Sequence, residues 1–196
     1  MRAQPIFSGL AFFVCSCTAE VSNPGKAPDY FSLDSLIEVQ VERLTVLNPK
    51  LEKSAILDGQ RETKDIHHDS VGWENELKVF RDANIDKPAY YGYYNLKTAQ
   101  SDKFSNLLFD EYSVRDDNDV PVKSLKIFYL DVKEALKKIE VVVIDKNELF
   151  NSERHLLMNF DNRQGSPLLS SYLVKGGQKL KFNEEVSYEM NGKLIF

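Results

Sequence analysis

The chain of 196 residues contains few cysteines and has no excess of positive charge. Its two cysteines, Cys15 and Cys17, both lie near the N-terminus, so the rest of the chain has none to cross-link. Lys and Arg total 25 against 30 Asp and Glu, a net charge of −5. This balance excludes the basic surface with which proteins grip a nucleic-acid backbone, and we expect no nucleic-acid partner.

Aromatic and aliphatic residues are plentiful despite the single Trp. The chain has 12 Phe and 9 Tyr, and hydrophobic residues make up 42% of it, which excludes full disorder and supplies a core. A length near 200 residues allows one domain, or at most two small ones. No apolar run approaches the ~20 residues that a membrane-spanning helix needs.

The first residues have the order of a secretory signal. Arg2 precedes an uncharged, largely apolar run over 6–14, and small residues follow it. This order of basic flank, short apolar stretch and small residues is typical of a signal peptide that is removed from the mature protein. We therefore predict a signal peptide over 1–16, and the alternative is a buried N-terminal helix or strand.

The residues at 14–17, Val-Cys-Ser-Cys, resemble a bacterial lipobox, with an aliphatic residue three positions before the second cysteine. The resemblance implies cleavage before Cys17 and acylation of its thiol, so that the mature chain is held at a membrane by lipid. The mature chain would then keep a single cysteine and no disulfide. The alternative is ordinary cleavage after Ala19, which would leave a secreted or periplasmic protein.

The second residue of the predicted mature chain, counted from Cys17, is Thr18, where an aspartate would mark retention in the inner membrane of enteric bacteria. Ala19 and Glu20 also lack the acidic cluster that resembles a surface-export signal of Bacteroidota. By these resemblances we expect an outer-membrane lipoprotein that faces the periplasm. Residues 17–30 are predicted to form the lipidated tether, and the Pro- and Gly-containing part from Val21 reaches at most ~35 Å.

Residues 31–196 are predicted to form a single α+β domain that begins with two helices around a hairpin. Ser32 is a favourable N-cap for a first helix over 31–48, and a second helix is expected over 69–85. Asp58-Gly59 supplies the positive φ angles of a type I′ turn within a hairpin over 51–66.

The remainder reads as a long antiparallel meander. Alternation with period two, as in Leu125, Ile127 and Tyr129, indicates strands with one buried and one wet face. Gly176-Gly177 and Asn191-Gly192 are expected to be tight turns. A meander of this length must twist, so we predict a large curved, half-barrel-like sheet on which the helices and hairpin pack. The predicted strands cover 89–96, 104–114, 122–131, 137–145, 153–161, 168–174, 178–182 and 185–190, with a terminal stub over 193–196.

Four segments of the mature chain resemble those of a family of small Bacteroidota lipoproteins to which no activity is assigned. The resemblance supports an envelope location and the fold, and it implies nothing about chemistry. The segments are LEKSAILDGQRETKDI, KPAYYGYY, SLKIFYLD and GGQKLKF.

The most unusual composition is the tyrosine-rich segment at 90–94. On a strand, Tyr91 and Tyr93 would share one face and could form a platform for a ligand, with Trp73 of the second helix covering the same region. The competing interpretation is structural, because tyrosines also stabilise sheets as cross-strand pairs and a lone Trp is usually part of the core.

Metal and catalytic patterns are nearly absent from the sequence. His67 and His68 are adjacent, so on a strand they point to opposite faces, and His155 has no spacing that links it to them; we expect a solvated loop there and no metal. The acidic run at 115–119 lacks the closing glutamate of a calcium loop and is expected to be a charged hairpin loop. No nucleophile elbow, phosphate loop or H-E-x-x-H motif occurs, so we predict neither enzyme activity nor a cofactor.

Two functional hypotheses follow. The first is a lipid-anchored envelope protein without catalytic activity, whose curved sheet shelters an apolar or lipid ligand. The second is a scaffold module that binds a glycan or an envelope protein through an exposed tyrosine-rich face. An internal cavity lined by Leu, Ile, Phe and Met would favour the first, and contiguous exposed tyrosines would favour the second.

Overall fold

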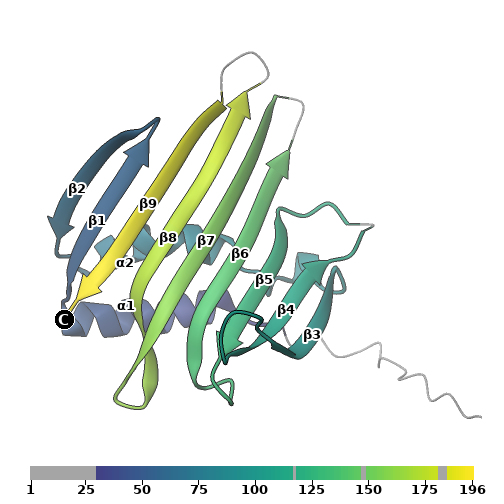
Figure 1. Cartoon of the computed structure of the whole chain (residues 1–196), viewed down its shortest axis with the longest axis horizontal. Coiled ribbons are helices and arrows are strands. Elements are labelled where there is room, and N and C mark those ends of the chain that lie inside the picture. Colours follow the sequence, from purple (N-terminus) through teal and green to yellow (C-terminus); the bar gives the residue numbers. More distant parts are fainter. Residues whose placement is uncertain (1–29, 117, 147–148, 181–184) are drawn as a thin grey trace, which may run out of the picture.

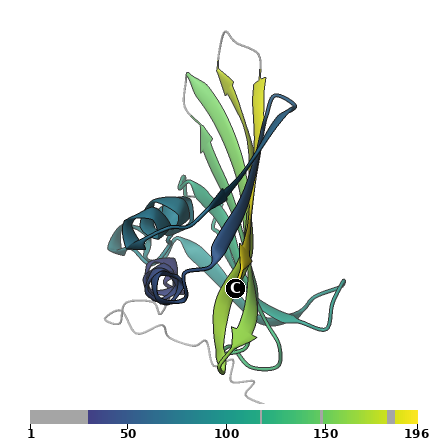
Figure 2. The ribbon, with the colours of Figure 1, turned by 90° about the vertical axis from the view of Figure 1, so that its left-hand side faces the viewer.

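The computed structural model describes residues 30–116, 118–146, 149–180 and 185–196. They form one antiparallel sheet of nine strands in the spatial order β2-β1-β9-β8-β7-β6-β5-β4-β3, with two helices on one face (Figure 1 and Figure 2). The predicted α+β class with a large antiparallel sheet is confirmed, and the sheet is open, with β2 and β3 at its edges. The strands are β1 (Lys50–Leu57), β2 (Gln60–Ile66), β3 (Tyr94–Ser101), β4 (Leu108–Val114), β5 (Val122–Tyr129), β6 (Leu136–Lys146), β7 (Phe150–Arg163), β8 (Ser166–Leu180) and β9 (Glu185–Ile195).

Helix α1 (Leu33–Leu47) forms where apolar spacing and capping agree. The Ser32 hydroxyl accepts a hydrogen bond from the backbone N–H of Ser35 at 3.3 Å, which satisfies one of the free donors at the helix start. The helix ends at Asn48, which adopts the left-handed conformation with φ 44°. The predicted helix is confirmed, and the side chains of its buried face are Leu33, Ile37, Gln40, Val41 and Leu44.

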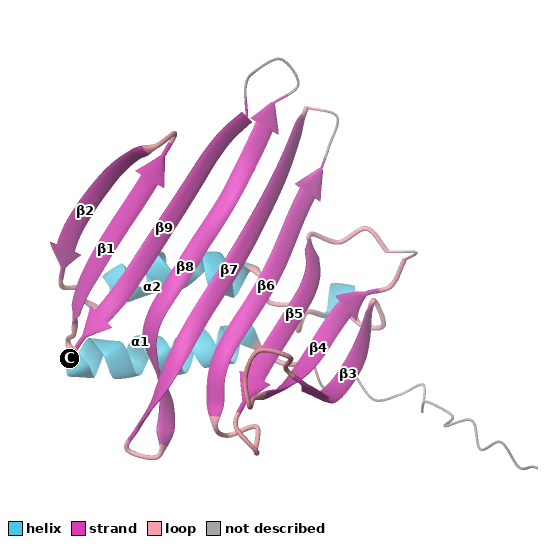
Figure 3. Cartoon of the chain, viewed as in Figure 1, coloured by secondary structure: helices cyan, strands magenta, loops and turns pink. Residues whose placement is uncertain are grey.

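Helix α2 (Ser70–Asp82) packs beside α1 on the same face of the sheet, as Figure 3 shows. Its N-cap is Asp69, whose carboxylate accepts from the Gly72 N–H at 2.7 Å. Its buried residues Trp73, Leu77 and Phe80 are spaced four and three apart, so they form one stripe facing the sheet. These three side chains have no exposed surface and form part of the core between the helices and the sheet.

Two buried amides join the helices to their surroundings. Gln40 of α1 accepts a hydrogen bond from the backbone N–H of Leu169 at 2.8 Å and donates to the Pro167 carbonyl at 3.3 Å. Asn84, just after α2, accepts from the Leu33 N–H at 3.0 Å, so it caps the start of α1 from outside. These bonds fix where both helices lie, because buried polar groups are costly unless paired.

The hairpin of β1 and β2 has the predicted turn. Asp58 and Gly59 have φ angles of 48° and 82°, which a type I′ turn requires at both central residues. Strand β1 also pairs along its whole length with β9, the last strand of the chain. The first and the last strand of the chain therefore lie side by side inside the sheet.

The tyrosine-rich segment differs from its prediction as a strand over 89–96. A short 3-10 helix, η1 (Pro88–Tyr90), and a turn with Gly92 at φ 84° occupy its first half, and β3 begins only at Tyr94. Proline lacks the N–H that a strand would use and fixes φ near helical values, which favours a helical start over a strand here. Tyr91 and Tyr93 consequently do not share a strand face.

The two predicted glycine turns are also wrong, because β8 and β9 run through them without a break. Gly176 lies opposite Tyr188, and Gly192 lies opposite Tyr172. In each pair the aromatic ring occupies the place of the missing side chain, so that a Cβ at the glycine would collide with the ring. The glycines serve close cross-strand packing rather than turns.

Candidate functional site

The face of the sheet opposite the helices carries a hollow that crosses β1, β2, β7, β8 and β9. Its volume is about 730 Å³, and we call it the open-face hollow. Alternate residues of a strand point to opposite faces. Leu156 and Met158 of β7 therefore lie in the core, and Leu157 and Asn159 of the same strand line the hollow. The lining residues used below are Glu52, Asp65, Leu157, Asn159, Asp161, Ser171, Leu173, Asn191 and Lys193.

An apolar floor and a set of uncharged polar groups make up the centre of the hollow. Leu157 and Leu173 face each other across β7 and β8, and both are half-buried. Beside them the Asn159 amide donates to the Ser171 hydroxyl at 3.0 Å. Asn191 pairs with Leu173 across β8 and β9 and donates to Glu189 at 3.0 Å. Donors, acceptors and a small apolar patch are therefore presented together.

The charges at the hollow are mixed. Lys50 pairs with Glu52 at 2.8 Å and with Asp65 at 3.2 Å at the edge formed by β1 and β2. Asp161 and Lys193, within the part of the chain that the structure describes, have no ion-pair partner. The hollow thus offers one carboxylate and one ammonium to a ligand, with no strong excess of either sign.

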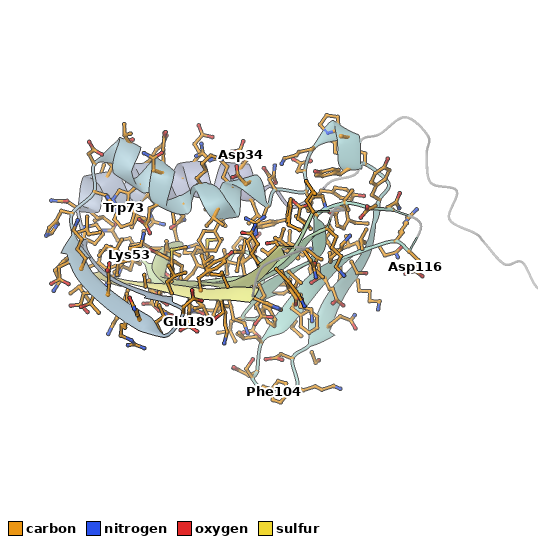
Figure 4. The ribbon with its side chains drawn as sticks, turned by 90° about the horizontal axis from the view of Figure 1, so that it is seen from above. Asp34, Lys53, Trp73, Phe104, Asp116 and Glu189 are labelled. Atoms are coloured by element: carbon orange, nitrogen blue, oxygen red, sulfur yellow. The ribbon has the colours of Figure 1, made fainter. Side chains whose placement is uncertain are left out.

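A second group of polar side chains lies on the helix-covered face, beside a cavity of about 380 Å³. The carboxylate of Glu76 on α2 accepts hydrogen bonds from the Lys53 ammonium at 2.7 and 2.9 Å and from the Tyr172 hydroxyl. The Nε2 atom of His68 is 3.3 Å from Glu76 Oε2. Figure 4 shows Lys53 between the sheet and α2. We call these four residues the Glu76 cluster.

The charge states of Glu76 and Tyr172 indicate that the Glu76 cluster joins α2 to the sheet. Burial alone raises the pKa of Glu76, but the hydrogen bonds from Lys53 and Tyr172 outweigh it and hold that pKa below its usual value. Burial and the neighbouring carboxylate raise the pKa of Tyr172 well above the ordinary range. At neutral pH Glu76 is charged and Tyr172 is neutral, so the cluster holds α2 to β1 and β8.

The structure does not bring the three predicted ligand residues together. Trp73 has no exposed surface and packs against His68 with ring centroids 5.1 Å apart. His68 follows β2 at one edge of the sheet, whereas the tyrosine-rich segment precedes β3 at the opposite edge. Tyr91 is half-buried, and its ring meets that of Tyr30 edge-on at 5.9 Å. Tyr93 is 37% exposed. Trp73 therefore cannot cover a platform formed by Tyr91 and Tyr93.

The tyrosine-rich segment instead surrounds Tyr30, the first described residue. The rings of Tyr91, Tyr94 and Tyr112 all lie edge-on to Tyr30 at centroid distances of 5.7 to 5.9 Å. The Tyr30 hydroxyl accepts from the N–H groups of Gly92 and Tyr94 at 3.0 and 3.4 Å. These contacts hold Tyr30 against β3 and β4 at the edge of the sheet.

The histidines do not form a metal site. Among the described residues no group of three or more His, Cys, Asp or Glu could hold a metal ion. The loop before α2 differs from its prediction as wholly solvated, because His68 is mostly buried between Trp73 and Glu76. His155 lies on β7 beside Glu153 at 2.9 Å. Cys17, the predicted acylation site, lies outside the described residues.

No known protein-family model matches this chain, and no curated protein and no solved structure is significantly similar to it. Among the described residues, neither helix has the length and apolar character needed to cross a bilayer. The function therefore has to be inferred from the chain's own residues.

The open-face hollow was missed by sequence reasoning. The pattern that could have indicated it is the polar residues that alternate with core residues along each strand. Asn159 and Ser171, for example, each lie next to a buried residue in the sequence. The local hairpin pairs Glu52 with Asp65, but only the pairing of β1 with β9 brings them to the hollow, and that pairing joins the first and the last strand.

Proposed function

We propose that this chain is a membrane-anchored lipoprotein of the cell envelope that binds a water-soluble glycan in its open-face hollow and has no catalytic activity of its own. The observation that carries the proposal is a concavity of about 730 Å³ on the uncovered face, lined by carboxylate, amide and hydroxyl groups around a small apolar floor. Ligand sites combine a concave shape with a few convergent polar groups in this way.

The lining groups suit the chemistry of a sugar. Sugar hydroxyls both donate and accept, so they pair with the carboxylate of Asp161, the amide of Asn191 and the hydroxyl of Ser171. The less polar face of a sugar ring can rest on Leu157 and Leu173. The mixed charge, with Asp161 and Lys193 both present, favours a neutral polyhydroxylated ligand over a strongly charged one.

Sheltering of an apolar or lipid ligand in a half-barrel remains the competing prediction. It needs an apolar interior, whereas Trp73, Leu77 and Phe80 are fully buried between the helices and the sheet. The cavity of about 380 Å³ on that face is lined by the charged Lys53 and Glu76. The tyrosine-rich version of the scaffold hypothesis needs exposed tyrosines, whereas Tyr91 packs on Tyr30. The packing at both places favours the open-face hollow as the binding surface.

The anchoring part of the proposal rests on the resemblance of residues 14–17 to a lipobox and on the resemblance to small Bacteroidota lipoproteins. It implies acylation at Cys17 and an outer-membrane location facing the periplasm. Intact-mass analysis of the chain purified from bacterial membranes tests it directly. Acyl masses on a chain that begins at Cys17 would support the anchor, and an unmodified chain that begins after Ala19 would replace it with a secreted protein.

The binding part is tested on the same full mature chain by native mass spectrometry and by calorimetric titration with soluble envelope oligosaccharides. We expect a bound oligosaccharide whose affinity falls in the Asn191→Ala variant and is kept in Val46→Ser, which changes an exposed side chain of α1 on the opposite side. A bound mass that extracts into organic solvent would contradict the glycan and favour the apolar ligand. A co-purifying protein that Asn191→Ala releases would favour a protein partner.

A further inference from the structure

The hairpin between β3 and β4 carries the most exposed large apolar side chain of the described residues. Phe104, at its tip, is 95% exposed, and Figure 4 shows it pointing away from the sheet on the side opposite the helices. Apolar residues scattered over a surface are common, but a fully exposed Phe at the end of a projecting turn offers its whole ring to whatever the turn meets.

The turn that presents Phe104 is internally bonded. The backbone N–H of Asp102 donates to the Leu107 carbonyl at 3.0 Å, and the Ser105 hydroxyl donates to the Asp102 carboxylate at 2.6 Å. The Leu107 N–H donates in turn to the Ser105 hydroxyl at 3.3 Å. These bonds hold the turn in one shape that keeps the Phe104 ring in water, so the exposure is a fixed feature of the hairpin.

The residues around the tip fit the boundary of a bilayer. Lys103 next to Phe104 is exposed. Because Leu108 pairs with Tyr129, the turn after β5 lies next to this hairpin, and it presents Val132, which is 57% exposed. An aromatic ring with a neighbouring lysine and a second apolar side chain is a composition that suits the interface between lipid headgroups and acyl chains.

The hairpin belongs to the edge of the sheet at which the predicted tether arrives. Tyr30, the last residue of that tether, packs on Tyr94 of β3 and Tyr112 of β4. The chain between Tyr112 and Phe104 can span at most about 28 Å, and the chain from Cys17 to Tyr30 can span at most about 45 Å. A lipid at Cys17 therefore keeps this edge, and Phe104 with it, within reach of the bilayer surface.

We propose that Phe104 inserts into the interface of the membrane that holds the Cys17 anchor, as a second membrane contact of the same molecule. The inference rests on the anchoring part of the proposed function and is independent of the ligand.

The test uses tryptophan as a reporter of insertion. Trp73 is the single Trp of the chain and has no exposed surface, so in a Phe104→Trp variant only the new indole is accessible. The acylated full mature chain is reconstituted into vesicles of phosphatidylethanolamine and phosphatidylglycerol. We expect a blue shift of the emission, loss of most of its quenching by acrylamide, and new quenching by lipids brominated on their acyl chains.

The matched control is Val46→Trp, which places an indole at an 84% exposed position of α1 on the helix side. It is expected to stay accessible to acrylamide in the same vesicles. An indole at position 104 that stays equally accessible would overturn the proposal. Protection that occurs only in native envelopes, and not in protein-free vesicles, would also overturn it and would indicate a protein partner.

A second measurement separates insertion from anchoring. Intact mass reports whether Cys17 is acylated; if it is not, the chain is held on nickel-chelating lipid through an N-terminal histidine tag and the quenching is repeated. In addition, for a Cys17→Ser chain free in solution, Phe104→Ser should lower the partition coefficient onto the same vesicles by about tenfold, since one Phe ring no longer leaves water. Equal partitioning of the two chains would contradict insertion, whatever the state of Cys17.

Discussion

The two faces of this sheet are built from the same strands, but the helices cover one face and the other carries the open-face hollow. On β7, Leu156 and Met158 are buried beneath the helices, while Leu157 and Asn159, which alternate with them along the strand, line the open-face hollow. Because neighbouring residues of a strand point to opposite sides, a single segment can supply a core and a recognition surface at once. Stability should therefore depend on one face and ligand binding on the other.

The largest expected effect lies on the covered face. Trp73→Ala removes a fully buried ring and leaves a cavity, so we expect a loss of about 3–5 kcal/mol in the free energy of unfolding. Leu173→Ala, on the open face, truncates a half-buried side chain and should cost about 1 kcal/mol or less. Urea denaturation followed by circular dichroism measures both. Similar costs for the two variants would break the distinction between the faces.

Two adjacent residues of β9, Asn191 and Gly192, test the difference in stability between the two faces within one strand. The ring of Tyr172 occupies the space beside Gly192 on the covered face, so Gly192→Ala forces the ring aside and should cost about 1–3 kcal/mol. Asn191→Ala changes the next side chain, which points to the open face, and should alter the free energy of unfolding by less than about 0.5 kcal/mol. The same denaturation experiment applies. A neutral Gly192→Ala would mean that the tyrosine can move at little cost.

The Glu76 cluster makes the covered face sensitive to acid. The pKa of Glu76 is lower in the folded chain than its usual value of 4.5, so its contribution to stability is complete above about pH 4.5 and is lost as the pH falls through the folded pKa. We expect the free energy of unfolding to fall in that range. In Glu76→Gln, where this proton is no longer taken up, the fall should be shallower and stability at pH 7 about 1–2 kcal/mol lower.

Asp110 provides the control for this pH dependence, because it is a second buried carboxylate on the covered face. Burial raises its pKa, but the Lys133 ammonium, the Ala99 N–H and the Tyr129 hydroxyl bind the carboxylate and hold its pKa below the usual value. Part of the acid sensitivity should therefore remain in Glu76→Gln. Identical pH profiles for the wild-type chain and Glu76→Gln would show that the Glu76 cluster does not tie α2 to the sheet.

The sequence predicts correctly those helix ends and turns that are determined by contacts between neighbouring residues. Ser32 caps α1, and Asp58-Gly59 form the hairpin turn, in both cases because the deciding contacts lie within a few residues. Gly176 and Gly192 were predicted as turns because glycine favours them, but their partners Tyr188 and Tyr172 on neighbouring strands decide otherwise. Local preference gives way wherever a distant residue fills the space.

The candidate site follows the same rule. Alternation along β7 and β8 was visible in the sequence, so the polar positions opposite the core could have been identified. The register that places Glu52 of β1 beside Lys193 of β9 depends on contacts between the first and the last strand, which no local pattern encodes. The tyrosine-rich segment is unusual only in its composition. The rings of Tyr91 and Tyr94 pack edge-on against Tyr30, which lies about 60 residues earlier in the chain.

The last expected change in stability is small and again concerns the open face. Asn159→Ala removes one partly buried hydrogen bond to Ser171, and we expect a loss of about 0.5 kcal/mol in the free energy of unfolding. If the hollow binds a glycan, the same variant should weaken the affinity about fivefold to tenfold, because a polar group that meets the ligand is gone. Calorimetric titration beside urea denaturation measures both quantities on one preparation. A variant that loses stability and keeps its affinity would place Asn159 with the core residues and would move the binding surface away from the hollow.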